Sequence, residues 1–86
     1  MTRISKLDFL ILDEIHKKGM NTVSQIGKDL NTTQPLISQH IQKFYDAQFV
    51  NYETRKNNRS MKWYFLTDKG KLFLESSRSL WEEQIE

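Results

Sequence analysis

The chain has 86 residues, a formal net charge of +2 and 37% hydrophobic residues. This length suits one domain and leaves no room for a separate ligand-binding domain. No apolar run approaches the roughly 20 residues that span a bilayer, so we expect a soluble protein that does not contact membranes.

The absence of cysteine excludes disulfides, thiolate metal sites and redox sensing by thiols. We see no cationic leader followed by an apolar stretch, so we expect no secretion signal and a cytoplasmic location, which includes the cytoplasm of a host cell. The charge is unevenly distributed, because residues 54–62 carry four cations and no acid whereas residues 82–86 are rich in glutamate.

Residues 5–18 are predicted to form the first helix, because Leu7, Ile11 and Ile15 fall on one stripe and a glycine follows. Phe9 and Leu12 fall on a second stripe, so a single core contact would leave part of this helix exposed. We expect another surface to cover them. The acidic residues at positions 8, 13 and 14 are interpreted as the polar side of the helix.

A second helix is predicted to follow Thr22, which has a glutamine three residues later, as in a capping box. Gly27 inside this helix costs about 1 kcal/mol relative to alanine, which suggests close approach by a neighbouring helix. A third helix is predicted from Thr33 or Gln34 to about residue 48, with a proline tolerated in its first turn.

The third helix has a buried stripe of Ile37, Ile41 and Phe44 and an outer face rich in amides and hydroxyls. Glutamine can pair with an adenine edge, serine can donate or accept, and lysine can reach guanine or phosphate. His40 lies at the edge of the stripe, where a packed histidine is the plainer interpretation. The candidate DNA contacts of this helix are Thr33, Gln34, Leu36, Ser38, Gln39, Gln42 and Lys43.

Residues 50–54 alternate apolar and polar positions and residues 61–66 are rich in aromatic strand formers, so they are predicted to form a β-hairpin. The polar, cationic residues 55–60 form its tip. Such a run can be an ordinary solvated loop, but beside a DNA-reading helix it would contact phosphates or the minor groove. The candidate contacts are Arg55, Lys56, Asn58, Arg59 and Lys62.

The last helix is predicted over about residues 68–84, with Thr67 as its N-cap and Asp68 in its first turn. It is apolar on more than one side, and so is the first helix. The two helices can pack on each other within one chain, but a domain this small favours a second copy as the cover. The candidate residues of that dimer interface are Phe9, Leu12, Phe73, Leu80 and Trp81.

Three short segments carry a family resemblance. Residues 30–41 (LNTTQPLISQHI) resemble the helix-turn-helix of ArsR-like regulators, and the continuation 44–50 (FYDAQFV) resembles that family's helix end and turn into the first wing strand. Residues 64–70 (YFLTDKG) are similar to the wing-to-helix junction of MarR and PadR-like proteins. Two departures stand out: Gln48 replaces the usual glycine, and the metal-binding Cys and His patterns are missing. The layout is similar to small winged-helix proteins of archaea, their viruses and plasmids.

The resemblance implies an α+β, mainly helical fold: a winged helix-turn-helix with three helices, a two-stranded wing and a C-terminal helix. Residues 1–86 would form one domain, with the helix-turn-helix at about 22–48, the wing at about 50–66 and the dimerisation helix at about 68–84. We expect a homodimeric, sequence-specific double-stranded DNA-binding transcription regulator, most simply a repressor. Its third helices would enter major grooves about 34 Å apart.

The alternative is a winged-helix interaction module, in which the same amide face and basic wing bind an acidic protein. An enzyme is not expected, because the two histidines lie on different predicted helices and no phosphate loop or metal-ligand spacing is present. We therefore expect no catalytic residues, no cofactor and no metal, and no small-molecule effector is evident from the sequence.

Overall fold

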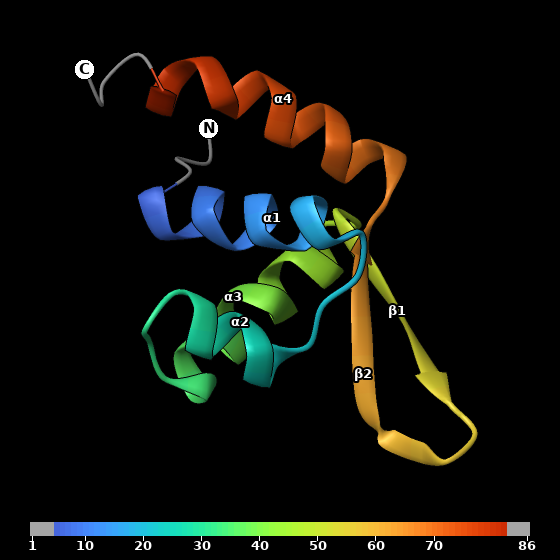
Figure 1. The fold of residues 1–86 in the computed structure, drawn as a ribbon. Helices are drawn as coiled ribbons and strands as arrows, with labels where there is room; N and C mark the ends of the chain where they lie inside the picture. The colour runs from blue at the N-terminus through green and yellow to red at the C-terminus, as the bar shows by residue number, and fades with distance from the viewer. Residues whose placement is uncertain (1–4, 83–86) are drawn as a thin grey trace.

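The computed structural model describes the backbone of residues 5–82 and the side chains of residues 5–78. Figure 1 shows α1 in the middle of the molecule, with α4 across one side, α2 and α3 on the other, and the hairpin projecting beyond them. The predicted mainly helical, winged helix-turn-helix architecture is confirmed. The elements are α1 (Lys6–Lys18), α2 (Val23–Asp29), α3 (Gln34–Asp46), β1 (Val50–Arg55), β2 (Asn58–Leu66) and α4 (Asp68–Glu82).

The core lies where α1 meets the other helices and the base of the hairpin. Each element places at least one aliphatic or aromatic side chain in it, and burial of such side chains supplies most of the driving force for folding. Within the described residues, no helix is long and apolar enough to cross a membrane. The buried apolar residues are Phe9, Ile11, Leu12, Ile15, Ile26, Ile37, Ile41, Phe44, Val50, Leu66 and Leu74.

The structure corrects the interpretation of α1. Phe9 is 5% exposed and Leu12 is 0% exposed within a single chain. Because α4 packs along α1 (Figure 1), the chain itself buries both stripes of this helix. The prediction that Phe9 and Leu12 form a dimer interface is therefore wrong, since neither side chain has surface left to offer. Asp8 is also buried, at 3% exposed, rather than on the polar side.

α4 begins as the sequence predicts. The Thr67 hydroxyl accepts a hydrogen bond from the backbone N–H of Gly70 at 3.0 Å and donates one to the Gln48 carbonyl at 2.6 Å. Phe73 is half-buried and stacks on Phe49, with ring centroids 4.3 Å apart. The Leu80 and Trp81 side chains lie outside the part of the chain that is described.

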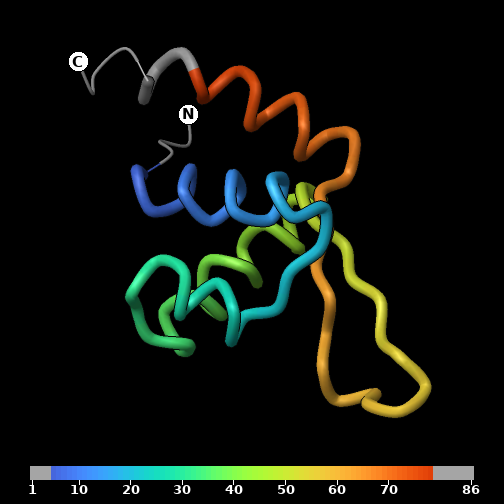
Figure 2. Tube along the Cα trace, in the orientation of Figure 1, coloured from blue at the N-terminus to red at the C-terminus, as the bar shows by residue number. Residues whose placement is uncertain are grey.

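The hairpin differs from the prediction at its tip. β2 already starts at Asn58, which pairs with Arg55, so only two residues form the turn. A register shift between Glu53 and Arg55 accommodates the extra residues of β2, and such a shift bends and twists a strand. The path of the tip is easiest to follow in Figure 2.

A short bridge that the sequence did not predict ties the hairpin to the helices. Asn21, between α1 and α2, exchanges two backbone hydrogen bonds with Tyr64 of β2, at 2.9 and 2.7 Å. The edge of β2 is thereby paired near its base, which fixes where the wing leaves the body.

Candidate nucleic-acid interface

The turn between α2 and α3 is tight. Asn31 has a φ of 54°, and the N–H groups of Asn31 and Thr32 bond to the carbonyls of Lys28 and Gly27 at 3.2 and 2.8 Å. This is a Schellman ending, in which asparagine tolerates the left-handed conformation. A Cβ on Gly27 would lie 3.1 Å from the Thr32 oxygen, so the predicted close approach is made by the turn backbone.

The end of α3 is built in the same way. The N–H groups of Gln48 and Phe49 bond to the carbonyls of Tyr45 and Phe44 at 3.0 and 2.8 Å, and Gln48 has a φ of 67°. α3 therefore stops at Asp46 rather than near residue 48. Gln48, which replaces the usual glycine, thus adopts the left-handed conformation that glycine favours.

α3 separates buried and exposed side chains as its periodicity predicts. Ile37, Ile41 and Phe44 are 0%, 2% and 2% exposed and hold the helix against the core. Leu36 is 37% exposed. Every side chain proposed to touch DNA on this helix is exposed: Thr33, Gln34, Leu36, Ser38, Gln39, Gln42 and Lys43.

Two of the amides on this face are held by neighbours within the chain. The Gln34 amide donates to the Ser24 hydroxyl at 3.4 Å, and the Gln42 amide donates to the Asp46 carboxylate at 3.0 Å. Among the described residues, neither Ser38 nor Gln39 forms a side-chain hydrogen bond. These two residues in the middle of α3 therefore present donors and acceptors with no competing partner.

Lys43 and His40 meet a carboxylate of α1. The Lys43 ammonium lies 3.0 and 2.9 Å from the two oxygens of Asp8, and His40 Nδ1 makes a short hydrogen bond to Asp8 Oδ1. Burial raises the pKa of Asp8, but the hydrogen bonds from Lys43, the Ser5 backbone and His40 outweigh it and hold the pKa below its ordinary value. The histidine is thus bonded to a side chain, a partner that the sequence interpretation did not foresee.

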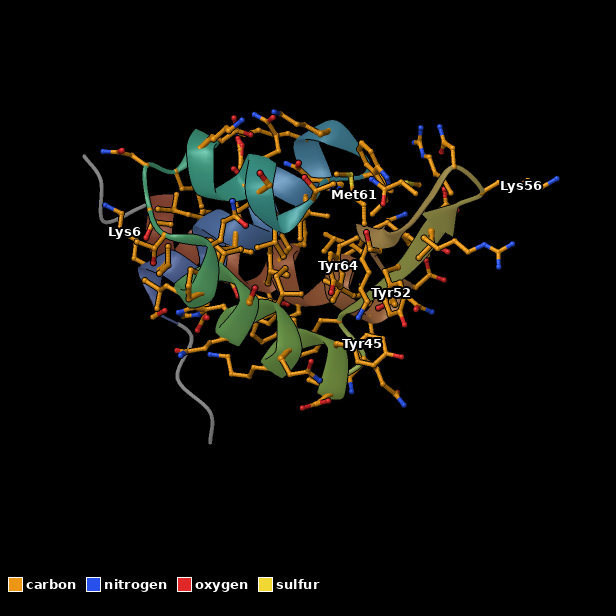
Figure 3. The ribbon with its side chains drawn as sticks, turned by 90° about the horizontal axis from the view of Figure 1, so that it is seen from below. Lys6, Tyr45, Tyr52, Lys56, Met61 and Tyr64 are labelled. Atoms are coloured by element: carbon orange, nitrogen blue, oxygen red, sulfur yellow. The ribbon has the colours of Figure 1, made fainter. Side chains whose placement is uncertain are left out.

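The cations of the wing are on exposed side chains, and two of them lie over aromatic rings of the hairpin. The Arg55 guanidinium lies 4.3 Å from the centroid of Trp63, and the Lys62 ammonium lies 4.8 Å from that of Tyr52. Such contacts hold a cation over the ring face while its outer side stays open to a ligand. Lys56 projects away from the body at the tip (Figure 3). The predicted wing contacts Arg55, Lys56, Asn58, Arg59 and Lys62 are all exposed.

A row of three tyrosines connects α3 to the wing. The ring centroids of Tyr45 and Tyr52 are 5.7 Å apart, and those of Tyr52 and Tyr64 are 5.6 Å apart. Figure 3 shows the three side by side between the end of α3 and the hairpin. Burial raises the pKa of Tyr64, and the neighbouring phenols of Tyr52 and Tyr45 add to the shift. Sequence reasoning missed this group, because strand alternation gives the faces of the hairpin but not which helix meets them.

A groove of about 280 Å³ lies between the start of α2 and the wing. Met61 sits at its wing side, visible in Figure 3 between the hairpin and α2. The groove joins the start of α2 to the wing, and the hydrogen bond between Gln34 and Ser24 joins the same part of α2 to the amide-rich face of α3. Among the described residues, no three His, Asp or Glu side chains gather closely enough to hold a metal ion. The groove is lined by Thr22, Val23, Ser24, Ser60, Met61, Lys62 and Tyr64.

The model of the MarR family matches residues 4–60 of the chain. Among solved structures, the transcriptional regulator BldR from Sulfolobus solfataricus is 20% identical, with a TM-score of 0.86 over 95% of this chain and 58% of its own. FabT from Streptococcus pneumoniae in complex with DNA is 21% identical, with a TM-score of 0.80 over 95% and 57%. A mutant MarR from E. coli complexed with operator DNA is 18% identical, with a TM-score of 0.80 over 90% and 55%.

At these identities the likeness shows a shared fold. The chain spans between 55% and 58% of the length of these three proteins, so it matches a part of each. Comparison with curated protein sequences gives no match.

Proposed function

The chain belongs to the MarR family, and on that premise we propose that it is a double-stranded DNA-binding transcription regulator that acts as a homodimeric repressor. The observation that carries the proposal is the interface itself. α3 has an exposed amide and hydroxyl face, and its end contacts, through Tyr45 and Tyr52, a wing that presents Arg55, Lys56, Arg59 and Lys62. Two structural neighbours, FabT and the E. coli MarR mutant, are described in complex with DNA.

In this proposal α3 enters the major groove, whose width admits one helix. Ser38 and Gln39 lie at its centre and read base edges, while Gln34 and Gln42 exchange their intramolecular bonds for bonds to bases. The wing cations bind phosphates and supply affinity that depends on salt rather than on sequence. Occupying a promoter would exclude polymerase, which makes repression the simplest outcome. No catalytic step is part of the proposal.

The second copy is proposed to bind through α4. Leu72 is 71% exposed on this helix, whereas Phe73 and Leu74 of the next positions pack inward. Leu80 and Trp81 remain candidates from the sequence alone. Sedimentation at micromolar concentration tests it: a mass near 20 kDa, twice the 10.3 kDa of one chain, supports the dimer, and a persistent monomer contradicts it.

Selection from random duplexes followed by gel shift tests DNA binding. With the enriched duplex, Gln39→Ala is expected to reduce discrimination against a scrambled sequence by about 1 to 3 kcal/mol. Arg59→Ala is expected to weaken binding to all duplexes alike and to lower the salt slope by about 0.9 for each phosphate that is no longer neutralised. Lys17→Ala is the matched control, since Lys17 is an exposed cation of α1 that pairs with Asp13.

If selection enriches no motif, and both variants bind duplex DNA as the unaltered chain does, the DNA-binding proposal fails. Binding to an acidic protein through the same residues would then identify the surface as a protein interaction module.

A further inference from the structure

Asp8 is a buried carboxylate that joins two helices. It lies on α1, is 3% exposed, and accepts hydrogen bonds from the Ser5 backbone at 3.1 Å, from His40 and from Lys43. The Lys43 ammonium reaches both of its oxygens, at 3.0 and 2.9 Å. The last two donors come from the DNA-reading helix, 32 and 35 positions away in sequence.

The two donors grip the carboxylate from one side of α3. Residues three apart in a helix lie one above the other on the same face. One carboxylate held by two such side chains therefore fixes the rotation of α3 about its own axis, in addition to the apolar stripe. Gln39 directly precedes His40, and Gln42 directly precedes Lys43, so each anchored residue is next to a candidate base reader.

The hydrogen bonds to Asp8 also occupy the ammonium of Lys43, which the sequence analysis predicted to contact DNA. Moving Lys43 to a phosphate would leave a 3% exposed carboxylate with one partner fewer. A buried charge that loses a partner is strongly destabilising. Lys43 therefore gains less from a phosphate than the exposed cations of the wing do.

We propose that Asp8 is a positioning residue for DNA recognition, which sets the rotation of α3 through His40 and Lys43 and withholds the Lys43 ammonium from DNA phosphates. This inference rests on the proposed DNA binding. It assigns to α1 a part in sequence discrimination, although Asp8 itself is buried and touches no DNA.

The test is the salt dependence of duplex binding by Asp8→Asn, Lys43→Gln and the double variant, on the selected site and on a scrambled duplex. Lys43→Gln alone is expected to leave the slope of log affinity against log salt unchanged. Asp8→Asn is expected to release the ammonium and steepen the slope by about 0.9 per protomer, an extra loss of about 3.5-fold per protomer between 50 and 200 mM salt. Adding Lys43→Gln to Asp8→Asn should restore the original slope.

Discrimination is the second measurement. Asp8→Asn is expected to lower the preference for the selected site over the scrambled duplex by roughly 10-fold, within the range expected when one base is no longer read. Asp13→Asn is the matched control: it removes the same charge from the same helix, but Asp13 pairs with Lys17 and Arg78 rather than with α3. It should change neither the slope nor the preference.

A shallower slope for Lys43→Gln alone would overturn the inference, because it would place Lys43 on DNA in the unaltered protein. An unchanged slope and preference for folded Asp8→Asn would also overturn it. If Asp8→Asn does not fold, the slope of Lys43→Gln decides, since position 43 is half-exposed and the glutamine amide can still donate a hydrogen bond to Asp8. The slope of log affinity against log salt can be measured on the scrambled duplex, so this test still works if the protein proves to bind DNA without sequence preference. If the unaltered chain binds no duplex at all, both the DNA-binding proposal and the proposed role of Asp8 are overturned.

Discussion

Replacing Gly70 by alanine should push the start of α4 away from the α3–β1 connection and destabilise the domain. A Cβ at this position would overlap the carbonyl oxygen of Phe49 and lie 2.9 Å from its carbonyl carbon. Both obstacles are backbone atoms of the α3–β1 connection, which the Thr67 N–H also bonds at 3.0 Å. Backbone atoms cannot relieve the overlap by changing a rotamer, so α4 and the α3–β1 connection must move apart.

The magnitude follows from that rigidity. Overpacking costs 1 to 3 kcal/mol where side chains can adjust, so a clash with backbone should cost about 3 kcal/mol or more. For a domain of this size that lowers the melting temperature by about 12 to 24 °C. The assay is thermal unfolding followed by far-ultraviolet circular dichroism, at one fixed protein concentration because association shifts apparent stability.

Gly27→Ala is the matched control, because Gly27 is also a helical glycine near backbone. Its Cβ would meet the Thr32 oxygen at 3.1 Å, which small shifts relieve. The gain in helix propensity, about 1 kcal/mol, should offset that close approach and leave stability within about 1 kcal/mol of the parent. The reasoning is refuted if Gly70→Ala melts within a few degrees of the parent, or if Gly27→Ala is the more damaging change.

Three further predictions concern the interface and its supports. Gln48→Gly should stabilise the domain by about 1 kcal/mol in urea unfolding, because glycine relieves the left-handed φ of 67°; a lower urea midpoint would contradict this. Because the pKa of Asp8 is lowered in the folded state, its contribution is present above about pH 4 and is lost as pH falls through the folded pKa. The parent should therefore lose stability below pH 4 more steeply than Asp8→Asn, and equal acid profiles would argue against the ion pair. Tyr52→Leu should cost about 1 to 3 kcal/mol, because it removes two ring–ring pairs, and should weaken duplex binding, while Tyr52→Phe keeps both properties; equal behaviour of the two variants would exclude a role for the ring row.

Local patterns predicted most of this fold. The stripe of Ile37, Ile41 and Phe44, the Thr67 cap and the basic hairpin each depend on residues within a few positions of one another. The helix ends were less accurate, since α3 stops two residues early. Gln48 takes the left-handed conformation without the glycine that usually signals it.

The errors share a physical cause, which is that burial depends on distant partners. The second apolar stripe of α1 showed that something covers Phe9 and Leu12, but periodicity cannot tell whether the cover is α4 or another molecule. Asp8 has the spacing of a solvated acid, and it is buried because His40 and Lys43 meet it from 32 and 35 positions away. No pattern within α1 contains that information.

Contacts between residues far apart in the sequence link α1, α3 and the wing. α3 is tied to α1 by Asp8 and to the wing by the row of Tyr45, Tyr52 and Tyr64. The wing is tied back to the helices by the hydrogen bonds between Asn21 and Tyr64. These links form a closed loop, so a shift of the wing on DNA must be accommodated in α3 or break one of them. We therefore expect base discrimination by α3 and phosphate binding by the wing to be coupled, with variants of the tyrosine row affecting both.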